Sequence, residues 1–252
     1  MQSGAEARNS GSGAAGMILT TDLGPPPTRV STIRERIARR MRESLASTAQ
    51  YTLNSSANAG GLLAVRAKVK AAQAKGTPNI NINDLVTFCT ILALREIPDL
   101  NAEFIDGKIY KHPQIHIGFA CDTPRGLIVP VVRDAQDLAI GELALKMKEL
   151  AEQAVQGTIS ADDLSGATFT ISNLGGLGIE SFTPLINPPQ VAILGVDAIQ
   201  VKPVRKNGQV EFIDSIGFSL TCDHQVVDGA PGARFLQVLK GKVENVESLC
   251  TI

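Results

Sequence analysis

The sequence predicts a two-layer α/β sandwich with a mixed β-sheet. Segments with strand patterns and segments with helix patterns follow one another without strict alternation, which argues against a regular parallel βα repeat. Hydrophobic residues make up 44% of the 252 residues, so one large domain has ample material for a core. The sequence shows no internal repeat of the kind that indicates a solenoid or a propeller.

The first half of the chain carries three helix patterns and one strand pattern. Thr32 and Glu35 form a capping box that opens the first helix. The apolar side of this helix consists of Ile33, Ile37 and Met41. In chain order, the next elements are a strand over 51–56, a helix over 62–74 broken by the turn residues 76–78, and a helix over 85–94 that Asn83 caps and that ends before Pro98.

The second half of the chain contains most of the predicted sheet. Asp137 is expected to cap a long amphipathic helix with apolar residues Ile140, Leu143, Met147, Leu150 and Ala154. Strands are expected over 115–120, 127–132, 168–171, 191–201 and 216–222. A final helix carries Ala233, Phe235, Leu236 and Leu239.

Composition excludes several classes of partner. The formal net charge is −1, so neither a nucleic acid nor an anionic membrane surface is indicated. No apolar run reaches the roughly 18 residues that span a bilayer, and the N-terminus lacks the order of a secretory signal. The four cysteines are scattered without a C-x-x-C pair, which predicts isolated thiols in a reducing compartment and no metal site.

The segment 222–230 carries the strongest functional signal. His224 is one of only three histidines, and it stands four residues before Asp228 and the turn residue Gly229. A histidine accepts and returns a proton near neutral pH, and a following Asp-Gly turn can fix the loop that aims it. The plain alternative is a surface histidine beside a turn.

Five segments of the chain together resemble a known protein family. Segments 166–175, 186–195 and 222–230, together with 126–132 and 33–38, resemble the catalytic domain of the dihydrolipoyl acyltransferases, the core component of 2-oxo-acid dehydrogenase complexes. The resemblance runs from about Val30 to the C-terminus. The segments around Ser172 and His224 look most like the pyruvate dehydrogenase branch, whose acyl group is acetyl. The resemblance implies a trimeric fold like that of chloramphenicol acetyltransferase. It also implies acyl exchange between dihydrolipoamide and coenzyme A.

The resemblance also implies roles for three side chains. His224 would take the proton from the attacking thiol and return it to the leaving sulfur. The Ser172 hydroxyl would stabilise the oxyanion; alternatively, Ser172 caps a turn with Asn173. Asp228 would hold the loop by pairing with an arginine, and Arg34 is a candidate unless it belongs to a solvated helix face. In the family the site lies between subunits, so His224 and Ser172 would come from different chains.

The remaining candidate residues are expected either to line the cofactor site or to have no function. Asn173, Gly175 and Gly176 are expected to line the cofactor site, where glycines let the backbone approach a ligand such as the pantetheine arm. Gly175, Gly176 and Gly178 lack the strand–turn–helix context of a dinucleotide site. His112 and His116 are expected to have no function. Two positions depart from the family pattern: Gln225 replaces an arginine, and Ala49-Gln50 replaces Pro-His, which puts normal efficiency in doubt.

Two domains are expected. Residues 1–29 are rich in Gly, Ser, Ala and Pro and predict a flexible linker; within it, 11–23 resembles the tail of a peripheral-subunit-binding domain, or is only a linker remnant. No lipoyl domain is expected before it in this sequence. Residues 30–252 form the acyltransferase catalytic domain.

The expected cofactors are coenzyme A as co-substrate and a lipoyl group on a separate domain or chain, with no metal. The expected partners are a homotrimer, a larger cubic or dodecahedral shell, lipoyl domains, and the decarboxylase and dihydrolipoamide dehydrogenase components. The expected location is the cytoplasm of a bacterium or the mitochondrial matrix of a eukaryote. A catalytically silent scaffold and an antibiotic acetyltransferase remain alternatives. Condensation domains share the histidine motif but need a much longer chain.

Overall fold

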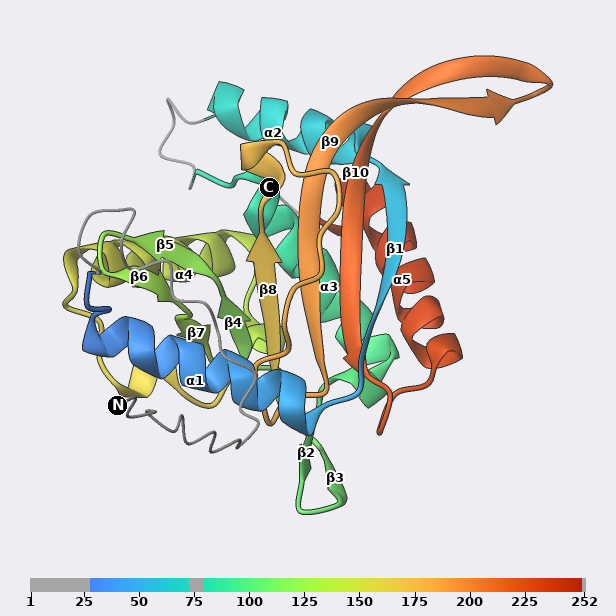
Figure 1. Ribbon diagram of the computed structural model, residues 1–252. Coiled ribbons are helices and arrows are strands. Elements are labelled where there is room, and N and C mark those ends of the chain that lie inside the picture. Colours follow the sequence, from blue (N-terminus) through green and yellow to red (C-terminus); the bar gives the residue numbers. More distant parts are fainter. Residues whose placement is uncertain (1–27, 73–78, 251–252) are drawn as a thin grey trace, which may run out of the picture.

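The computed structural model describes residues 28–72 and 79–250. Its centre is a six-stranded sheet in the order β1-β10-β9-β8-β4-β7 (Figure 1). The strands are β1 (Gln50–Asn58), β4 (Ile117–Phe119), β7 (Val131–Val132), β8 (Phe169–Asn173), β9 (Ala192–Lys206) and β10 (Gln209–Asp223). β8 runs parallel to both of its neighbours and the other pairs are antiparallel, so the sheet is mixed, as predicted.

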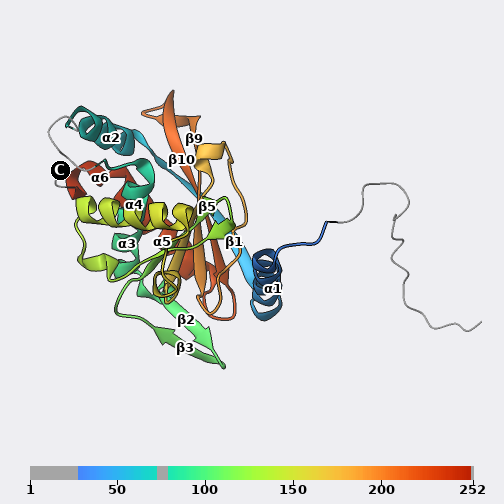
Figure 2. The same ribbon diagram turned by 90° about the vertical axis from the view of Figure 1, so that its left-hand side faces the viewer.

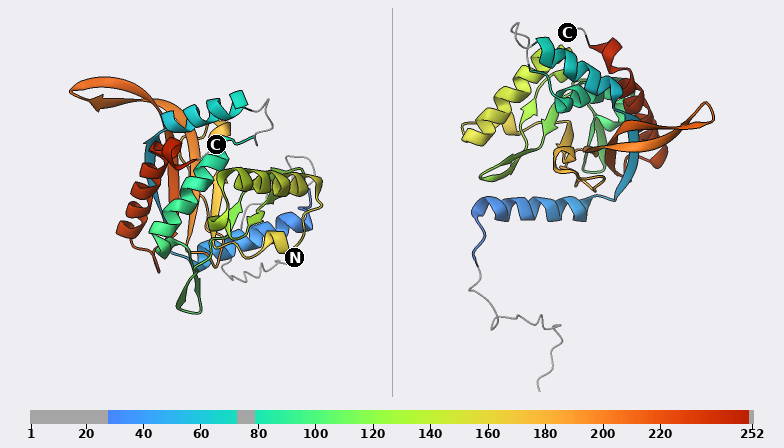
Figure 3. Two further views of the ribbon diagram at one scale, coloured as in Figure 1. Left: turned by 180° about the vertical axis from the view of Figure 1, so that it is seen from behind. Right: turned by 90° about the horizontal axis from the view of Figure 1, so that it is seen from above.

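Helices form the second layer on one face of the sheet. They are α2 (Gly60–Ala72), α3 (Ile82–Glu96), α4 (Ile140–Gln156), α5 (Gly229–Glu244) and the short α6 (Val246–Leu249). Figures 2 and 3 show α1 (Thr32–Ser47) on the opposite side of the sheet. The predicted fold class is therefore confirmed. None of the helices in the described ranges combines the length and apolarity needed to cross a membrane.

The core lies between the sheet and the helices and fixes the position of α5. Phe169 of β8 and Phe235 of α5 are fully buried, with ring centroids 5.8 Å apart. Emptying such a site costs about 3–5 kcal/mol. This packing holds α5 against the sheet, and with it the segment 224–228 that precedes the helix.

The predicted N-caps are displaced by one or two residues at three helices. Ser31 rather than Thr32 caps α1, Asn81 rather than Asn83 caps α3, and Ala139 rather than Asp137 precedes α4. At α3 the cap is reciprocal, because Asn81 Oδ1 accepts from the Asp84 N–H at 3.0 Å while Asp84 Oδ2 accepts from the Asn81 N–H at 2.8 Å. Several suitable residues stand close together at each helix start, and only the backbone conformation decides which one caps.

Two small hairpins flank the main sheet, and the sequence patterns miss most of them. β2 (Ala102–Ile105) pairs with β3 (Lys108–Lys111), and β5 (Cys121–Thr123) pairs with β6 (Gly126–Ile128). The single strand predicted over 127–132 is wrong, since this segment contributes β6 to one sheet and β7 to another. Pro130 lies between the two and has no N–H for a continuous ladder.

The β9–β10 hairpin extends beyond the body of the domain (Figure 1). Both strands are longer than predicted, because the patterns over 191–201 and 216–222 cover mainly their buried parts. Asn207 and Gly208 form the turn with φ of 51° and 82°, the left-handed pair that suits a tight hairpin. The outer part exposes Val201, Val210 and Phe212 by 67%, 63% and 73%.

Candidate active site

His224 follows β10 directly, and its backbone is fastened to the start of β1. The His224 N–H donates to the Ala49 carbonyl at 2.9 Å, and the Ala49 N–H donates to Asp223 Oδ1 at 3.0 Å. The Val226 and Val227 N–H groups both donate to the Asp223 carbonyl, at 3.0 and 2.9 Å. The loop before α5 is therefore held from both sides.

The His224 ring is half-exposed and lies between Tyr51 and Asp228. Its centroid is 4.8 Å from that of Tyr51, and Nδ1 is 3.6 Å from Asp228 Oδ1. Burial raises the pKa of the Tyr51 phenol, which stays protonated and donates to the Asp228 carbonyl at 2.9 Å. A proton on Nδ1 is favoured by the carboxylate of Asp228, and this tautomer leaves Nε2 as the basic nitrogen.

The loop is held by Asp223 and not by the predicted ion pair of Asp228. Asp228 is 83% exposed in its side chain, and within residues 28–72 and 79–250 neither Arg34 nor another Lys or Arg pairs with it. The Arg34 guanidinium instead lies beside Gly126. Asp223, 1% exposed, accepts from the N–H groups of Ala49 and Gln225, both at 3.0 Å. An aspartate directly after an apolar strand is the signal that could have found this role, because it favours such turns.

Ser172 lies on the interior strand β8, near the end of the sheet opposite to His224. It pairs in register with Gly195 of β9, which pairs with Ser219 of β10. β8 and β10 run in opposite directions (Figure 1). Ser172 near the C-terminal end of β8 and His224 after the C-terminal end of β10 therefore lie at opposite ends of the strands. The five residues from Ser219 to His224 alone correspond to about 16 Å of strand. A single chain does not bring Ser172 and His224 together.

Asn173, Gly175 and Gly176 line a cavity of about 740 Å³ next to Ser172. Asn173 accepts from the Gly175 N–H at 2.9 Å and donates to Asn83 Oδ1 at 3.0 Å, which ties this loop to the start of α3. A Cβ at Gly175 would lie 2.5 Å from the Asp197 carbonyl oxygen, so only glycine fits there. Beyond the predicted residues, the lining includes Arg66, Asn81, Ile82, Asn83, Leu177, Val196, Asp197, Ile199 and Ile216.

Asp197 is a buried carboxyl group that the sequence patterns missed. It is 2% exposed, and the Ser219 hydroxyl donates to it at 3.0 Å. Burial raises the pKa of Asp197 to about 6. It borders both the 740 Å³ cavity and a second cavity of about 420 Å³ that includes Glu180 and Lys202. A charged residue inside the apolar strand 191–201 was the available signal.

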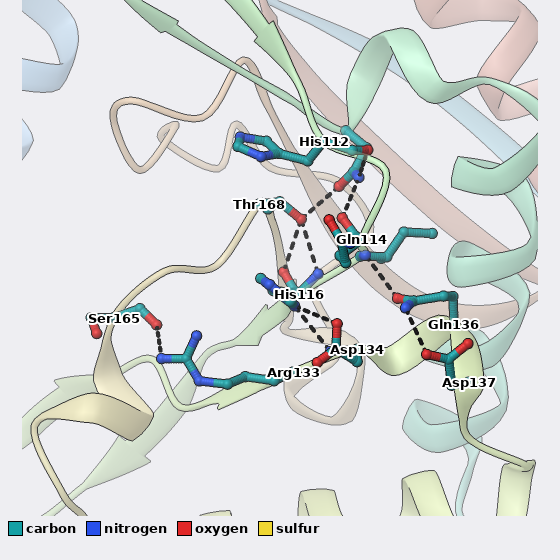
Figure 4. A network of polar contacts seen from close by, with 11 residues as sticks. His112, Gln114, His116, Arg133, Asp134, Gln136, Asp137, Ser165 and Thr168 are labelled. Atoms are coloured by element: carbon teal, nitrogen blue, oxygen red, sulfur yellow. Dashed lines mark hydrogen bonds and ion pairs between the residues drawn. The ribbon is translucent and has the colours of Figure 1, made fainter.

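His112 and His116 lie in a separate polar network (Figure 4). His112 Nε2 is 3.0 Å from Glu103 Oε2, and His116 Nδ1 accepts from the Asp134 N–H at 2.9 Å. The His116 N–H donates to Thr168 Oγ1 at 3.0 Å. These contacts connect the segment before β4 to the segment before β8 and give both rings structural partners.

No group of three or more His, Cys, Asp or Glu side chains converges as metal ligands in the part of the chain that the structure describes. The four cysteines are free thiols, as predicted. Burial raises the pKa of Cys121 to about 11 and that of Cys222 to about 12, so neither is a thiolate at neutral pH.

Residues 26–251 match the family model for the 2-oxoacid dehydrogenases acyltransferase (catalytic domain). The dihydrolipoyllysine-residue acetyltransferase component of the acetoin cleaving system of Bacillus subtilis is 37% identical over 87% of this chain and 56% of its own length. The succinyltransferase component of the Escherichia coli 2-oxoglutarate dehydrogenase complex is 34% identical over 87% of this chain and 54% of its length. The chain thus spans about half the length of these curated relatives.

Solved structures agree in fold over most of the chain. One comes from a study of the role of a serine, a histidine and an asparagine in the catalytic mechanism of Azotobacter vinelandii dihydrolipoamide acetyltransferase. It has a TM-score of 0.86 at 33% identity and covers 91% of this chain and 96% of that one. A probable dihydrolipoamide acetyltransferase from Listeria monocytogenes has a TM-score of 0.85 at 29% identity, with coverage of 91% and 98%.

Proposed function

The chain belongs to the catalytic-domain family of the 2-oxoacid dehydrogenase acyltransferases, and from this membership we propose that it transfers an acetyl group between dihydrolipoamide and coenzyme A. One observation carries the assignment to particular residues. The serine, histidine and asparagine studied in the Azotobacter vinelandii enzyme have the same spacing along that chain as Ser172, His224 and Asp228 have here. Acetyltransferases among the relatives favour acetyl over the succinyl group of the Escherichia coli relative.

His224 acts as the general base in this proposal. An ordinary thiol has a pKa near 8.5, so at neutral pH only a minor fraction is thiolate. Nε2 of His224 takes the proton of the attacking coenzyme A thiol while the sulfur of coenzyme A bonds to the acyl carbon. When the bond from that carbon to the lipoyl sulfur breaks, His224 returns the proton to the leaving sulfur. Help of this kind is worth about two to four orders of magnitude in rate.

Ser172 stabilises the negative charge that develops on the thioester oxygen. It directly precedes Asn173, which lines the 740 Å³ cavity together with Gly175 and Gly176. A fixed donor at a developing oxyanion is worth roughly 3 kcal/mol. Arg66 is the cation on the cavity wall, and we assign this cavity to coenzyme A, with the glycines beside its pantetheine arm.

The active site is shared between copies of the chain. Ser172 and His224 lie at opposite ends of the strands of one sheet, so a complete site needs His224 of one copy facing Ser172 of another. The apolar outer part of the β9–β10 hairpin is a surface that a second copy can cover, because a two-stranded ribbon is only marginally stable by itself. We propose a homotrimer as the functional unit, built into a larger shell, with lipoyl domains and the decarboxylase and dihydrolipoamide dehydrogenase as partners. A bacterial source places it in the cytoplasm and a eukaryotic source in the mitochondrial matrix.

A direct assay tests the function. The assembled protein is given dihydrolipoamide with acetyl-CoA, succinyl-CoA or isobutyryl-CoA, and the new thioester is measured. We expect transfer from acetyl-CoA to be fastest, and His224→Ala to lower it at least a hundredfold. His112→Gln, a histidine change in the separate polar network, should keep at least half of the activity. No transfer from any acyl-CoA, or a His224→Ala loss below fivefold, would contradict the proposal, and transfer to chloramphenicol instead would indicate an antibiotic acetyltransferase.

A further inference from the structure

Gln225, in the loop after β10, and Gln50, at the start of β1, meet at one corner of the structure. Gln225 Nε2 donates to the Ser47 carbonyl at 2.8 Å and reaches both oxygens of Asp223 at 3.1 Å. Gln50 Nε2 donates to Ser44 Oγ at 2.9 Å and to Thr48 Oγ1 at 2.8 Å. Both glutamine side chains therefore bond to the turn that joins α1 to β1.

This turn also carries the backbone contact of His224. Ala49 lies between Ser47 and Gln50; its carbonyl accepts from the His224 N–H, and its N–H donates to Asp223. On the far side, Gln50 Oε1 accepts from the Ile186 N–H at 3.2 Å. Each glutamine thus fixes one side of the short segment that fastens the loop of His224.

Asp223 is the charged member of this corner. Its carboxylate is held by neutral N–H donors alone, from Ala49 and from the backbone and side chain of Gln225. Within residues 28–72 and 79–250 no Lys, Arg or His forms an ion pair with it. An arginine at position 225 would place a guanidinium charge where the neutral amide now lies.

We propose that Gln50 and Gln225 are coupled positioning residues that fix His224 from the α1–β1 turn and leave the negative charge of Asp223 unneutralised beside it. The proposal rests on the proposed function only in assigning His224 as the base. Among the described residues, the other ionisable groups around His224 are Asp228, which directly precedes α5, Tyr51 of β1 and Cys222 of β10. Beyond Ser47, a groove of about 590 Å³ carries Arg36, Arg39, Arg40 and Glu43 of α1.

The charge of Asp223 makes the proposal measurable. A nearby negative charge favours protonated imidazole, and an added positive charge favours the neutral ring. The size of the displacement depends on the separation between the charge and the ring, and its sign depends on the sign of the charge. Gln225→Arg should therefore move the midpoint of the His224 ring to lower pH, and Gln225→Glu should move it to higher pH.

The experiment follows the ring itself as well as the activity. The chain has only three histidines, so the ring signals of the assembled protein can be followed by NMR over pH and assigned with His224→Ala. We expect Gln225→Arg to lower the His224 midpoint and Gln225→Glu to raise it. Gln225→Ala should lower kcat about tenfold with KM within twofold. Gln156→Ala, an exposed glutamine on α4, is the matched control and should change nothing.

Coupling is tested by the double variant. If both glutamines fix the same turn, Gln50→Ala added to Gln225→Ala should cost no more than about twofold beyond Gln225→Ala. Losses that multiply would overturn the coupling, and an unmoved ring midpoint in both Gln225→Arg and Gln225→Glu would overturn the role of Asp223. Wild-type kcat in Gln225→Ala would overturn positioning. A shifted ring in a protein that transfers no acyl group would contradict the proposed function while supporting this inference.

Discussion

Ser172 is half-buried at the end of β8, and no described residue hydrogen-bonds its hydroxyl. A hydroxyl without a structural partner can be removed at little cost to the fold, which separates its chemical role from a structural one. The same separation does not hold for Asp223, whose carboxylate joins two strands and a turn.

Ser172→Ala should lower kcat about a hundredfold with little change in KM. The lost donor is worth roughly 3 kcal/mol in the transition state and little in the ground state, because the oxyanion forms only during the reaction. Steady-state kinetics with acetyl-CoA and dihydrolipoamide measure this, and the melting temperature should stay within about 1 °C. Unchanged turnover with a raised KM would make Ser172 a substrate-positioning residue.

Asp228→Asn should keep kcat within about threefold, whereas Asp228→Ala should lower it about tenfold. Asp228 Oδ1 lies 3.6 Å from His224 Nδ1, and an asparagine at this position retains an oxygen that can accept from the ring. The loop itself is held by Asp223, so the exposed carboxylate of Asp228 contributes little to folding. Equal losses in the two variants, measured by the same assay, would show that the negative charge is essential.

Asp197→Asn should stabilise the protein at pH 7.5 and weaken the pH dependence of its stability. The pKa of Asp197 is raised to about 6 from 3.8, so the native state keeps this proton between about pH 4 and 6 while the unfolded chain releases it. Its contribution is therefore most favourable at low pH and falls as pH rises through about 6. One unit of displacement is about 1.4 kcal/mol; because two cavities give water partial access, we expect about 1 kcal/mol. Urea unfolding at pH 5 and 7.5 measures this, and the exposed Asp122→Asn, which should show no such difference, is the control.

At the scale of elements, local sequence patterns predict the secondary structure and the buried face of a segment. The apolar residues of α4 recur at helical spacing, and Ile140, Leu143 and Met147 are buried as predicted. Position in three dimensions decides the rest. Asp223 bonds to Ala49 across 174 residues, and no local pattern contains that contact. For the same reason a charge inside the apolar segment 191–201 could mark Asp197, but the sequence alone could not show its contact with Ser219 of the next strand.

Gly157→Ala should destabilise the protein by about 1–2 kcal/mol. Gly157 ends α4 with φ of 75°, a left-handed conformation, and a Cβ there would lie 0.9 Å from the Arg125 guanidinium. The added methyl is strained and displaces a cation from the negative end of the helix. Gly241→Ala is the matched control, because this glycine lies inside α5 with open space around it and should gain up to about 1 kcal/mol. Equal effects of the two changes in denaturant unfolding would contradict this account.

At the scale of the whole molecule, the sheet topology supports the proposal that the active site is shared between copies of the chain. β8 runs parallel to β9, whereas β10 runs antiparallel to β9. The end of β8 that carries Ser172 and the end of β10 that precedes His224 therefore lie at opposite ends of the sheet. No side-chain movement in one chain closes a gap of that length. A closed ring of copies can place the His224 edge of one chain against the Ser172 edge of the next.

Mixed assemblies should recover activity that neither parent has. His224→Ala and Ser172→Ala chains, each expected to keep about one per cent of wild-type activity or less alone, are unfolded together and refolded as random trimers. Under cyclic symmetry about a quarter of the interfaces then join an intact His224 to an intact Ser172, so about a quarter of wild-type activity should return. Refolding each variant alone is the control, and a mixture of separately assembled trimers should stay inactive. Well-formed mixed trimers without activity would show that both residues act from one chain, and activity in a stable monomer would remove the shared site altogether.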